Sequence, residues 1–288
     1  MKPAPFDYHR PSSVDEAVAT LAATGGKVLA GGQSLVPIMS MRLASPASLV
    51  DINHIPGLDG IEVNAEQVHI GALTRHRQLE LDAGAFAVSP LLRRSLECVA
   101  HPTIRNRGTT VGSLIHADPA AEMPAVLLLL DGSVDVVSTA RGARTIAAAD
   151  LFAGPLESAL VADELAIGAT FGNPPRGSGT AWVELARRHG DYALVGAGAV
   201  VQVDADRRVA SARVALISVG PTPILIDVSA ACGLATLEAI DGRAVGELVD
   251  AGIDPETDIQ ASADYRRHLA RVLTARAVSQ AAREAIPA

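Results

Sequence analysis

The sequence is poor in several residue types that mark particular classes of protein. Only two of its 288 residues are cysteine, Cys98 and Cys232. Two are too few for a disulfide framework or for an iron–sulfur cluster held by four thiolates. Aromatic residues make up 3% of the chain, so Ala, Val, Leu and Ile must supply the volume of the core. Any iron–sulfur cluster that exchanges electrons with this chain must therefore lie on another chain.

Positive charge and long apolar runs are scarce as well. Lysine occurs only at positions 2 and 27, and the formal net charge of −8 provides no basic face for nucleic acid. No apolar run approaches the roughly 20 residues that span a bilayer, and the N-terminal residues lack the apolar segment of a secretory signal. We therefore expect a cytoplasmic protein without a transmembrane segment. The eight histidines follow no zinc-binding spacing, so we expect no metal site.

The most informative segment covers residues 101–124 and reads H-P-T-I-R-N-R-G-T-T-V-G-S-L-I-H-A-D-P-A-A-E-M-P. Gly108 and Gly112 lie among small hydroxylated residues, where the backbone can turn sharply and present N–H groups to an anion. Asp118 before a proline fits the cap of a helix over residues 119–130. A loop that leads into a helix N-terminus suits a phosphate or a polar cofactor edge. On this segment alone, an ordinary surface loop before a buried helix is an equally good interpretation.

A second glycine-containing segment covers residues 27–35 and reads K-V-L-A-G-G-Q-S-L. It is a short apolar strand followed by Gly31 and Gly32, and it matches neither a P-loop nor a Rossmann glycine pattern. The two glycines can bring main-chain N–H groups against a pyrophosphate. Taken alone, however, Gly-Gly after a strand favours a plain turn.

Local patterns predict alternating helices and strands, with antiparallel strands towards the C-terminus. Ser13 and Glu16 form a capping box before an apolar helical stripe that Gly25 ends. A Pro/Gly-rich stretch over residues 172–179 is the best candidate for a domain boundary. We expect strands near 27–30, 48–52, 61–63, 67–70, 134–137, 165–169, 182–187, 197–203 and 209–219, and helices near 74–82, 90–100, 119–130, 229–239 and 263–285, with a loop over 101–118.

Together the two glycine-containing segments resemble the flavin-binding medium subunit of the molybdenum hydroxylases. This family includes the medium subunit of aerobic carbon monoxide dehydrogenase and the flavin domain of xanthine dehydrogenase. It shows A-G-G-Q-S-L near the N-terminus and, later, I-R-N-R-G-T-I-G-G-S-L-x-H-A-D-P-A-A-E-x-P. Here these motifs are residues 30–35 and 104–124. The resemblance continues in family order through residues 152–160, 163–165 and 187–195, so it covers essentially the whole chain.

The resemblance implies an α+β fold with two domains. Residues 1–175 would form a two-lobed FAD-binding domain of the PCMH/vanillyl-alcohol-oxidase type, with lobes over about 1–57 and 58–175. Residues 176–288 would form a smaller α+β domain with an antiparallel sheet.

The resemblance also implies which residues hold FAD. The first segment would bind the pyrophosphate through backbone N–H groups, and the second would form the facing wall, with hydroxyl contacts from Thr109 and Ser113. Asp118 and Glu122 would lie near the flavin, and Tyr192 would pack against its ring. The full set of expected cofactor-binding residues is Leu29, Ala30, Gly31, Gly32, Gln33, Ser34, Leu35, Thr109, Thr110, Val111, Gly112, Ser113, Asp118, Glu122 and Tyr192; no catalytic acid or base is expected.

The function implied is that of an FAD-carrying electron-transfer subunit. A large molybdenum–pterin subunit would oxidise the substrate, and a small subunit with two [2Fe–2S] clusters would pass the electrons to FAD, in a dimer of heterotrimers. The flavin would then reduce an external acceptor. Two alternatives remain: a structural subunit that has lost functional FAD, and a stand-alone flavin oxidase.

Two positions depart from the family pattern. Val111 stands where the family's first glycine of T-I-G-G is expected, and a β-branched residue resists a positive φ and blocks close approach of a ligand. Glu184 stands where a lysine is common, which removes a positive charge near the site. Both departures predict weaker retention of FAD.

Overall fold

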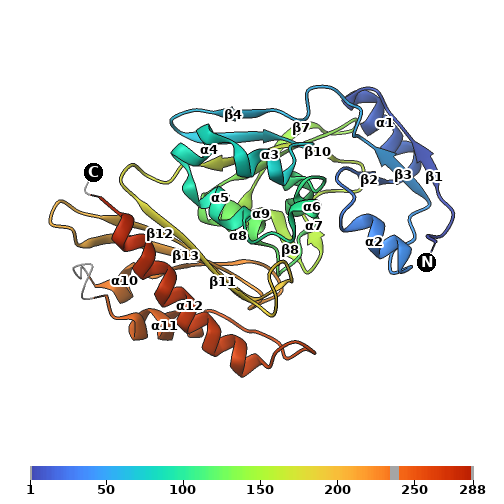
Figure 1. Ribbon diagram of the computed structural model, residues 1–288. Helices are drawn as coiled ribbons and strands as arrows, with labels where there is room; N and C mark the ends of the chain where they lie inside the picture. The colour runs from blue at the N-terminus through green and yellow to red at the C-terminus, as the bar shows by residue number, and fades with distance from the viewer. Residues whose placement is uncertain (1, 234–239, 287–288) are drawn as a thin grey trace.

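The computed structural model describes residues 2–233 and 240–286 and arranges them around three main β-sheets of three, five and four strands (Figure 1). The sheets follow one another along the chain, apart from β10, which returns to the middle of the five-stranded sheet. Most helices pack between or against these sheets. The fold is therefore α+β, as expected.

The N-terminal lobe is a small parallel sheet of order β1-β3-β2, built from Asp7–His9, Ser48–Asp51 and Lys27–Leu29. Helix α1 (Val14–Thr24) begins at Ser13, whose side chain accepts a hydrogen bond from the Glu16 N–H. It ends at Gly25, which has a left-handed backbone with φ 60°. The predicted Ser13 cap and the glycine stop are thus confirmed, whereas the reciprocal half of the capping box is not, because the Glu16 carboxylate accepts hydrogen bonds from the N–H and hydroxyl of Ser12 instead. Helix α2 (Leu35–Ser40) follows β2 directly.

The middle sheet is antiparallel throughout, in the order β4-β5-β10-β6-β7. Val68 and Ile70 on β5 face a hydrophobic core shared with the helices, while His69 between them faces the opposite side. The strands are β4 (Ile61–Val63), β5 (Gln67–Gly71), β10 (Leu165–Gly172), β6 (Ser133–Ser138) and β7 (Gly142–Ala147).

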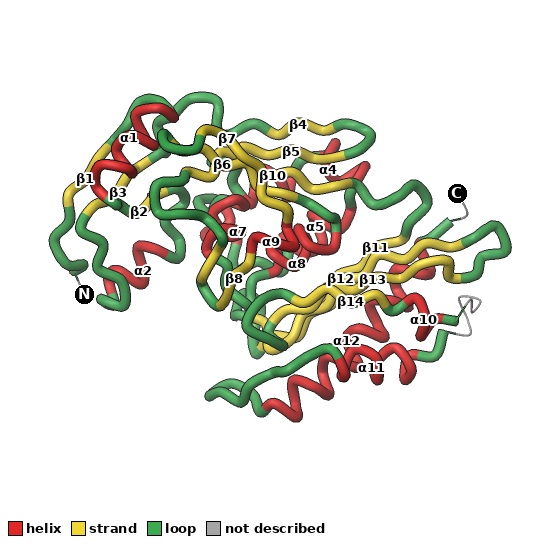
Figure 2. The backbone as a smooth tube through the Cα atoms, turned by 180° about the vertical axis from the view of Figure 1, so that it is seen from behind, coloured by secondary structure: helices red, strands yellow, loops and turns green. Residues whose placement is uncertain are grey.

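Short helices cover one face of this sheet, as Figure 2 shows from behind. They are α3 (His76–Leu81), α4 (Ala83–Val88), α5 (Pro90–Leu96), α6 (Pro102–Arg105), α7 (Thr110–His116), α8 (Glu122–Leu129) and α9 (Ala148–Leu151), followed by the β8–β9 ribbon (Phe152–Gly154 and Glu157–Ser158). Every residue of α8 is buried. A helix that is buried all round must have neighbours on every side, and α8 packs against helices α5, α7 and α9 and against the C-terminal sheet.

The C-terminal part is a four-stranded antiparallel sheet, β11 (Gly179–Ala186), β12 (Ala193–Val203), β13 (Val209–Ile217) and β14 (Ile224–Asp227). One face packs on α8, and the other on α11 (Gly242–Ala251) and the long α12 (Ala263–Glu284). Helix α10 (Ser229–Cys232) leads into residues outside the description. The antiparallel C-terminal sheet is therefore confirmed.

Two bidentate ion pairs join the C-terminal sheet and helices to the rest of the chain. Arg94 on α5 donates to both carboxylate oxygens of Glu284 at 2.7 and 3.0 Å. Arg213 on β13 donates to both oxygens of Asp131 at 2.6 and 2.7 Å. Such fork-to-fork pairs fix orientation as well as distance.

Some predicted elements are wrong. The expected loop over 101–118 contains α6 and α7, and the helix expected from residue 119 begins at Glu122. The cap of α3 is Arg75, one residue after the threonine predicted for it. Patterns over the short β1, α2, β7, α9, β8, β9 and α11 gave no prediction at all, and most of the helix expected over 229–239 lies outside the described residues.

Candidate functional site

The fold brings the two glycine-containing segments into contact. Gly31 lies so close to the second segment that a Cβ atom there would be 2.5 Å from the carbonyl oxygen of Arg107 and 2.8 Å from Cα of Gly108. Gly32 has a left-handed backbone with φ 71°, which turns the chain from β2 towards α2. Two loops about 75 residues apart in the sequence therefore pack against each other and form one continuous surface.

The first segment presents unused hydrogen-bond donors. Among the described residues, the backbone N–H groups of Gly31, Gly32, Gln33, Ser34 and Leu35 have no acceptor. These residues are all half-buried. Consecutive free N–H groups at a glycine turn form an anion-binding concavity, so this segment fits the pyrophosphate of a dinucleotide.

A polar network that the sequence did not reveal holds the two segments together. Arg75 donates one hydrogen bond to the Arg107 carbonyl at 2.6 Å and another to Oδ1 of Asn53 at 2.7 Å. Asn53 in turn donates to the Ala30 carbonyl at 2.8 Å. Neither Arg75 nor Asn53 stands in a recognisable motif, and only the tertiary fold identifies them as supports of the site.

Helix α7 begins next to the first segment but turns the side chains of its first residues into the core. Thr109 caps the helix, accepting a hydrogen bond from the Gly112 N–H at 3.2 Å. Thr110 is fully buried, with its hydroxyl 3.1 Å from Nδ1 of His76, and burial lowers the pKa of His76 to about 4. The side chain of Thr110 thus faces the core, so it can offer a ligand only its backbone.

Val111 does not face the proposed cofactor site, although the comparison with the family motif predicted that it would obstruct FAD. It lies inside α7 without a left-handed backbone, and it is 2% exposed in the core shared by the sheet and helices. The expectation that this valine obstructs a ligand is therefore wrong, because its side chain points into the core. Gly112 and Ser113 on the same turn are half-buried; both of their N–H groups donate to Thr109, so the Ser113 hydroxyl is the group that can contact a ligand.

Asp118 is not a helix cap. Its carboxylate accepts a hydrogen bond from the Ala120 N–H at 2.8 Å, which closes a turn between α7 and α8. Glu122 opens α8 and is 8% exposed. Tyr192 is 61% exposed on the loop before β12, and partial burial of its phenol, followed by the charges of Asp118 and Glu122, raises its pKa. These three candidate residues therefore gather at one place.

Glu184 belongs to the same neighbourhood. Burial raises the pKa of Glu122 to about 8, and the charge of Glu184 adds to the shift. Burial also raises the pKa of Glu184 to about 7, although a hydrogen bond from the Trp182 indole acts in the opposite direction. The unusual acid noted in the sequence is thus half-buried, and its charge opposes ionisation of Glu122.

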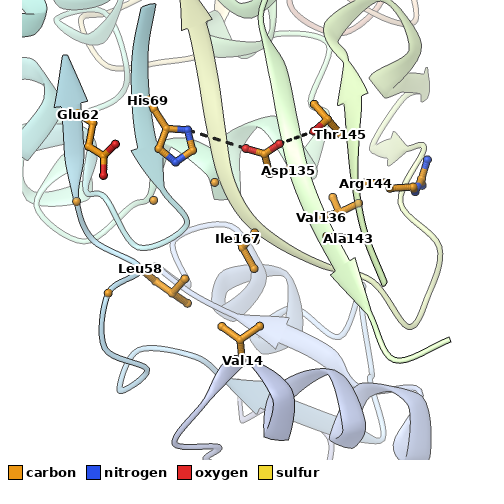
Figure 3. Close-up of a pocket in the computed structure, with 14 residues that line it drawn as sticks. Val14, Leu58, Glu62, His69, Asp135, Val136, Ala143, Arg144, Thr145 and Ile167 are labelled. Atoms are coloured by element: carbon orange, nitrogen blue, oxygen red, sulfur yellow. Dashed lines mark hydrogen bonds and ion pairs between the residues drawn. The ribbon is translucent and has the colours of Figure 1, made fainter. Parts of the chain in front are cut away.

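A separate pocket of about 480 Å³ lies on the other face of the five-stranded sheet (Figure 3). There Asp135 accepts a hydrogen bond from Thr145 at 2.7 Å and lies 3.9 Å from Nδ1 of His69. None of the residues expected to hold FAD lines this pocket. Within the described residues, no group of three His, Cys, Asp or Glu side chains could hold a metal ion, and no helix is long and apolar enough to cross a membrane.

Comparisons with known proteins identify the family of the chain. Residues 4–170 match the family described as the FAD binding domain in molybdopterin dehydrogenase, and residues 180–281 match the CO dehydrogenase flavoprotein C-terminal domain. The chain is 39% identical to the 6-hydroxypseudooxynicotine dehydrogenase complex subunit alpha of Paenarthrobacter nicotinovorans, over 100% of this chain and 98% of that protein. It is 37% identical to the caffeine dehydrogenase subunit beta of a Pseudomonas species, over 98% and 96% of the two chains.

The fold is similar to that of a solved flavoprotein chain as well. A chain of the reconstituted CO dehydrogenase from Oligotropha carboxidovorans superposes with a TM-score of 0.92 at 35% identity, covering 99% of this chain and 100% of that one. Fold and site together define a flavin-binding component of an oxidoreductase. The chain belongs to the family of FAD-binding medium subunits of the molybdenum hydroxylases.

Proposed function

We propose that this chain carries electrons from the [2Fe–2S] clusters of a partner subunit, through FAD, to an external acceptor. The observation that carries the proposal is the row of free N–H groups at residues 31–35, held against the second glycine-containing segment. Bound FAD supplies the redox chemistry, while the protein supplies binding, orientation and electrostatics.

The residues present suit FAD in their chemistry. The N–H groups of residues 31–35 would hold the pyrophosphate, and Gly112 and Ser113 would form the facing wall with the cap residue Thr109. Asp118, Glu122 and Tyr192 would lie towards the flavin end. The contributions of Leu29, Ala30, Thr110 and Val111 would come from the backbone or from packing.

The two cysteines support electron entry from another chain. Burial raises the pKa of Cys98 to about 12, and burial also raises the pKa of Cys232. Metal ligation requires the thiolate, which both environments oppose. The proposed partners are therefore a small subunit with two [2Fe–2S] clusters and a large molybdenum–pterin subunit, assembled as a dimer of heterotrimers. The relatives of this chain include a dehydrogenase complex subunit and carbon monoxide dehydrogenase medium chains, which is consistent with such an assembly.

The alternative of a structural subunit that has lost functional FAD loses one of its two supports. It rested partly on Val111 as an obstruction, and this side chain is buried in the core. The free N–H groups of the first segment would also have no partner in a chain that had abandoned FAD.

The experiment compares the isolated chain with the purified complex. The chain loaded with FAD is mixed with small N-heterocycles or carbon monoxide, and flavin bleaching is followed by absorbance. We expect no bleaching by the chain alone and bleaching in the complex with its own substrate. Substrate-dependent flavin reduction by the chain alone would contradict the proposed route.

A further inference from the structure

The long helix α12, which runs along the C-terminal sheet (Figure 1), carries a buried arginine, Arg266, that is 6% exposed. One guanidinium nitrogen, Nη1, donates to the carbonyl oxygens of Leu194 at 2.6 Å and of Ser218 at 3.3 Å. The other terminal nitrogen, Nη2, donates to Oδ2 of Asp258 at 2.8 Å, so the buried charge has a counter-ion. A planar guanidinium bound to three oxygens is rigid, and it fixes the main chain at residues 194 and 218 relative to α12.

Both carbonyl groups lie at the end of the C-terminal sheet that adjoins the candidate site. Leu194 is the second residue of β12, directly after the loop 187–192 that ends with Tyr192. Ser218 directly follows β13, which pairs with β12 close to this end. Arg266 therefore joins the start of one strand to the end of its neighbour.

Ser218 extends this restraint to the candidate site. Its backbone is left-handed, with φ 63°, and its N–H donates to the carbonyl oxygen of Pro119 at 2.9 Å. Its hydroxyl donates to the carbonyl oxygen of Ala193 at 2.8 Å. Pro119 directly follows Asp118, and Ala193 directly follows Tyr192. One serine thus ties together the main chains beside two of the residues that we expect at the flavin end.

The same loop has a second support at His101. Gly190 has φ 85°, and a Cβ atom there would lie 2.4 Å from Cε1 of His101. The ring of His189 meets that of His101 edge to face, with 6.1 Å between the ring centroids. The loop before β12 is therefore held at His101 and at Ser218. The side chain of Tyr192, which lies between these supports in the sequence, is 61% exposed and can pack against a ligand.

We propose that Arg266 and Ser218 are positioning residues, which hold the Tyr192 loop in the conformation that packs against bound flavin. This inference rests on the proposed function, in which Tyr192 lies at the flavin end. A surface loop has to be ordered before an aromatic side chain on it can contribute to binding, and that ordering weakens the affinity. A loop that is already fixed by main-chain hydrogen bonds avoids this loss.

The test measures FAD affinity in a double-mutant cycle on the full chain. We expect Tyr192→Ala and Arg266→Met each to weaken FAD binding about fivefold, the size of one lost aromatic contact. Because Arg266 acts through Tyr192, the double variant should bind FAD no more weakly than Tyr192→Ala alone. A combined loss of about 25-fold would mean that the two residues act independently, and it would overturn the inference. Unchanged affinity in Arg266→Met would overturn it as well.

The matched control is Arg271→Met. Arg271 lies on the same helix and also pairs with an aspartate, but that aspartate is Asp250 on α11. Its removal should leave FAD affinity at the wild-type value. A loss as large as that in Arg266→Met would show that any broken ion pair on α12 has this effect, and it would contradict the positioning role.

Ser218→Ala covers the case in which loss of the buried arginine prevents folding. This change removes the hydroxyl that binds the Ala193 carbonyl and leaves the Arg266–Asp258 pair intact. We expect FAD affinity to fall about threefold, the size of one hydrogen bond, with no further loss when Tyr192→Ala is also present. An additive loss, or none at all, would overturn the inference. A wild-type chain that binds no FAD refutes the proposed function, whereas FAD binding with additive losses refutes only the positioning role.

Discussion

At the scale of single residues, two glycines shape the proposed cofactor site for different reasons. Gly31 provides space, because a Cβ atom would meet the Arg107 carbonyl at 2.5 Å. Gly32 provides conformation, because its φ of 71° is one that side-chain-bearing residues rarely adopt. The sequence showed that two glycines stand here, but it could not show which loop Gly31 touches.

The first prediction concerns Gly31→Ala. The added methyl group must push the two segments apart, so the N–H groups lose their alignment and FAD affinity falls about tenfold, or about 1.4 kcal/mol. Titration of FAD into stripped protein measures the change. Gly60→Ala is the control, since a Cβ there meets nothing within 4 Å. Equal affinities in both variants would show that the contact between the segments is unimportant.

The second prediction concerns acid stability and Glu164. Its carboxylate accepts hydrogen bonds from Arg144 at 2.7 and 2.8 Å, which lower its pKa to about 2 from an ordinary 4.5. A lowered pKa stabilises the fold above about pH 4.5, and this stabilisation is lost as the pH falls towards 2. Urea unfolding at several pH values should show a smaller acid loss in Glu164→Gln than in wild type. The exposed Glu157→Gln should keep the wild-type slope, and an identical slope in Glu164→Gln would contradict the assignment.

At the scale of elements, the sequence predicted long periodic segments well and short ones poorly. Helix α1 with its Ser13 cap, the β4–β5 hairpin and α12 have strong local signals, and all three are confirmed. Helices α6 and α7 contain four and seven residues, too few for an apolar period to appear. Their positions depend on tertiary contacts such as the buried Arg105–Glu80 ion pair, at 2.8 Å, which no local pattern reveals.

The third prediction concerns Val111 in α7. Because its side chain is buried, Val111→Gly removes core packing and adds the cost of glycine in a helix, so stability should fall by about 3 kcal/mol. Urea unfolding measures this loss. Val36→Gly in α2, where the side chain is 46% exposed, should cost only about 0.5 kcal/mol, because the difference in helix propensity between valine and glycine is the main effect there. A stabilised Val111→Gly protein, or one with tighter FAD binding, would mean that the valine does face the cofactor.

At the scale of the whole molecule, the candidate site lies where the N-terminal lobe, the helices of the middle part and the C-terminal sheet adjoin. The α8 helix packs between helices α5, α7 and α9 and the C-terminal sheet, and the Arg94–Glu284 and Arg213–Asp131 pairs hold that sheet in place. The resemblance to the family predicted the domain order and the two glycine-containing segments. It did not predict that the charge of Glu184 on β11 acts on Glu122 in α8, because only the tertiary fold brings these two elements into one neighbourhood.

The most direct test of the central claim is an FAD titration of the stripped chain, with Gly32→Val compared with Gly57→Val. Both glycines have a left-handed backbone, with φ of 71° and 79°, so valine strains both turns by about 1–2 kcal/mol. Only Gly32 belongs to the row of free N–H groups. We predict one FAD per chain in wild type and in Gly57→Val, and loss of FAD from a folded Gly32→Val chain. Stoichiometric FAD in Gly32→Val, or none in wild type, would contradict the account.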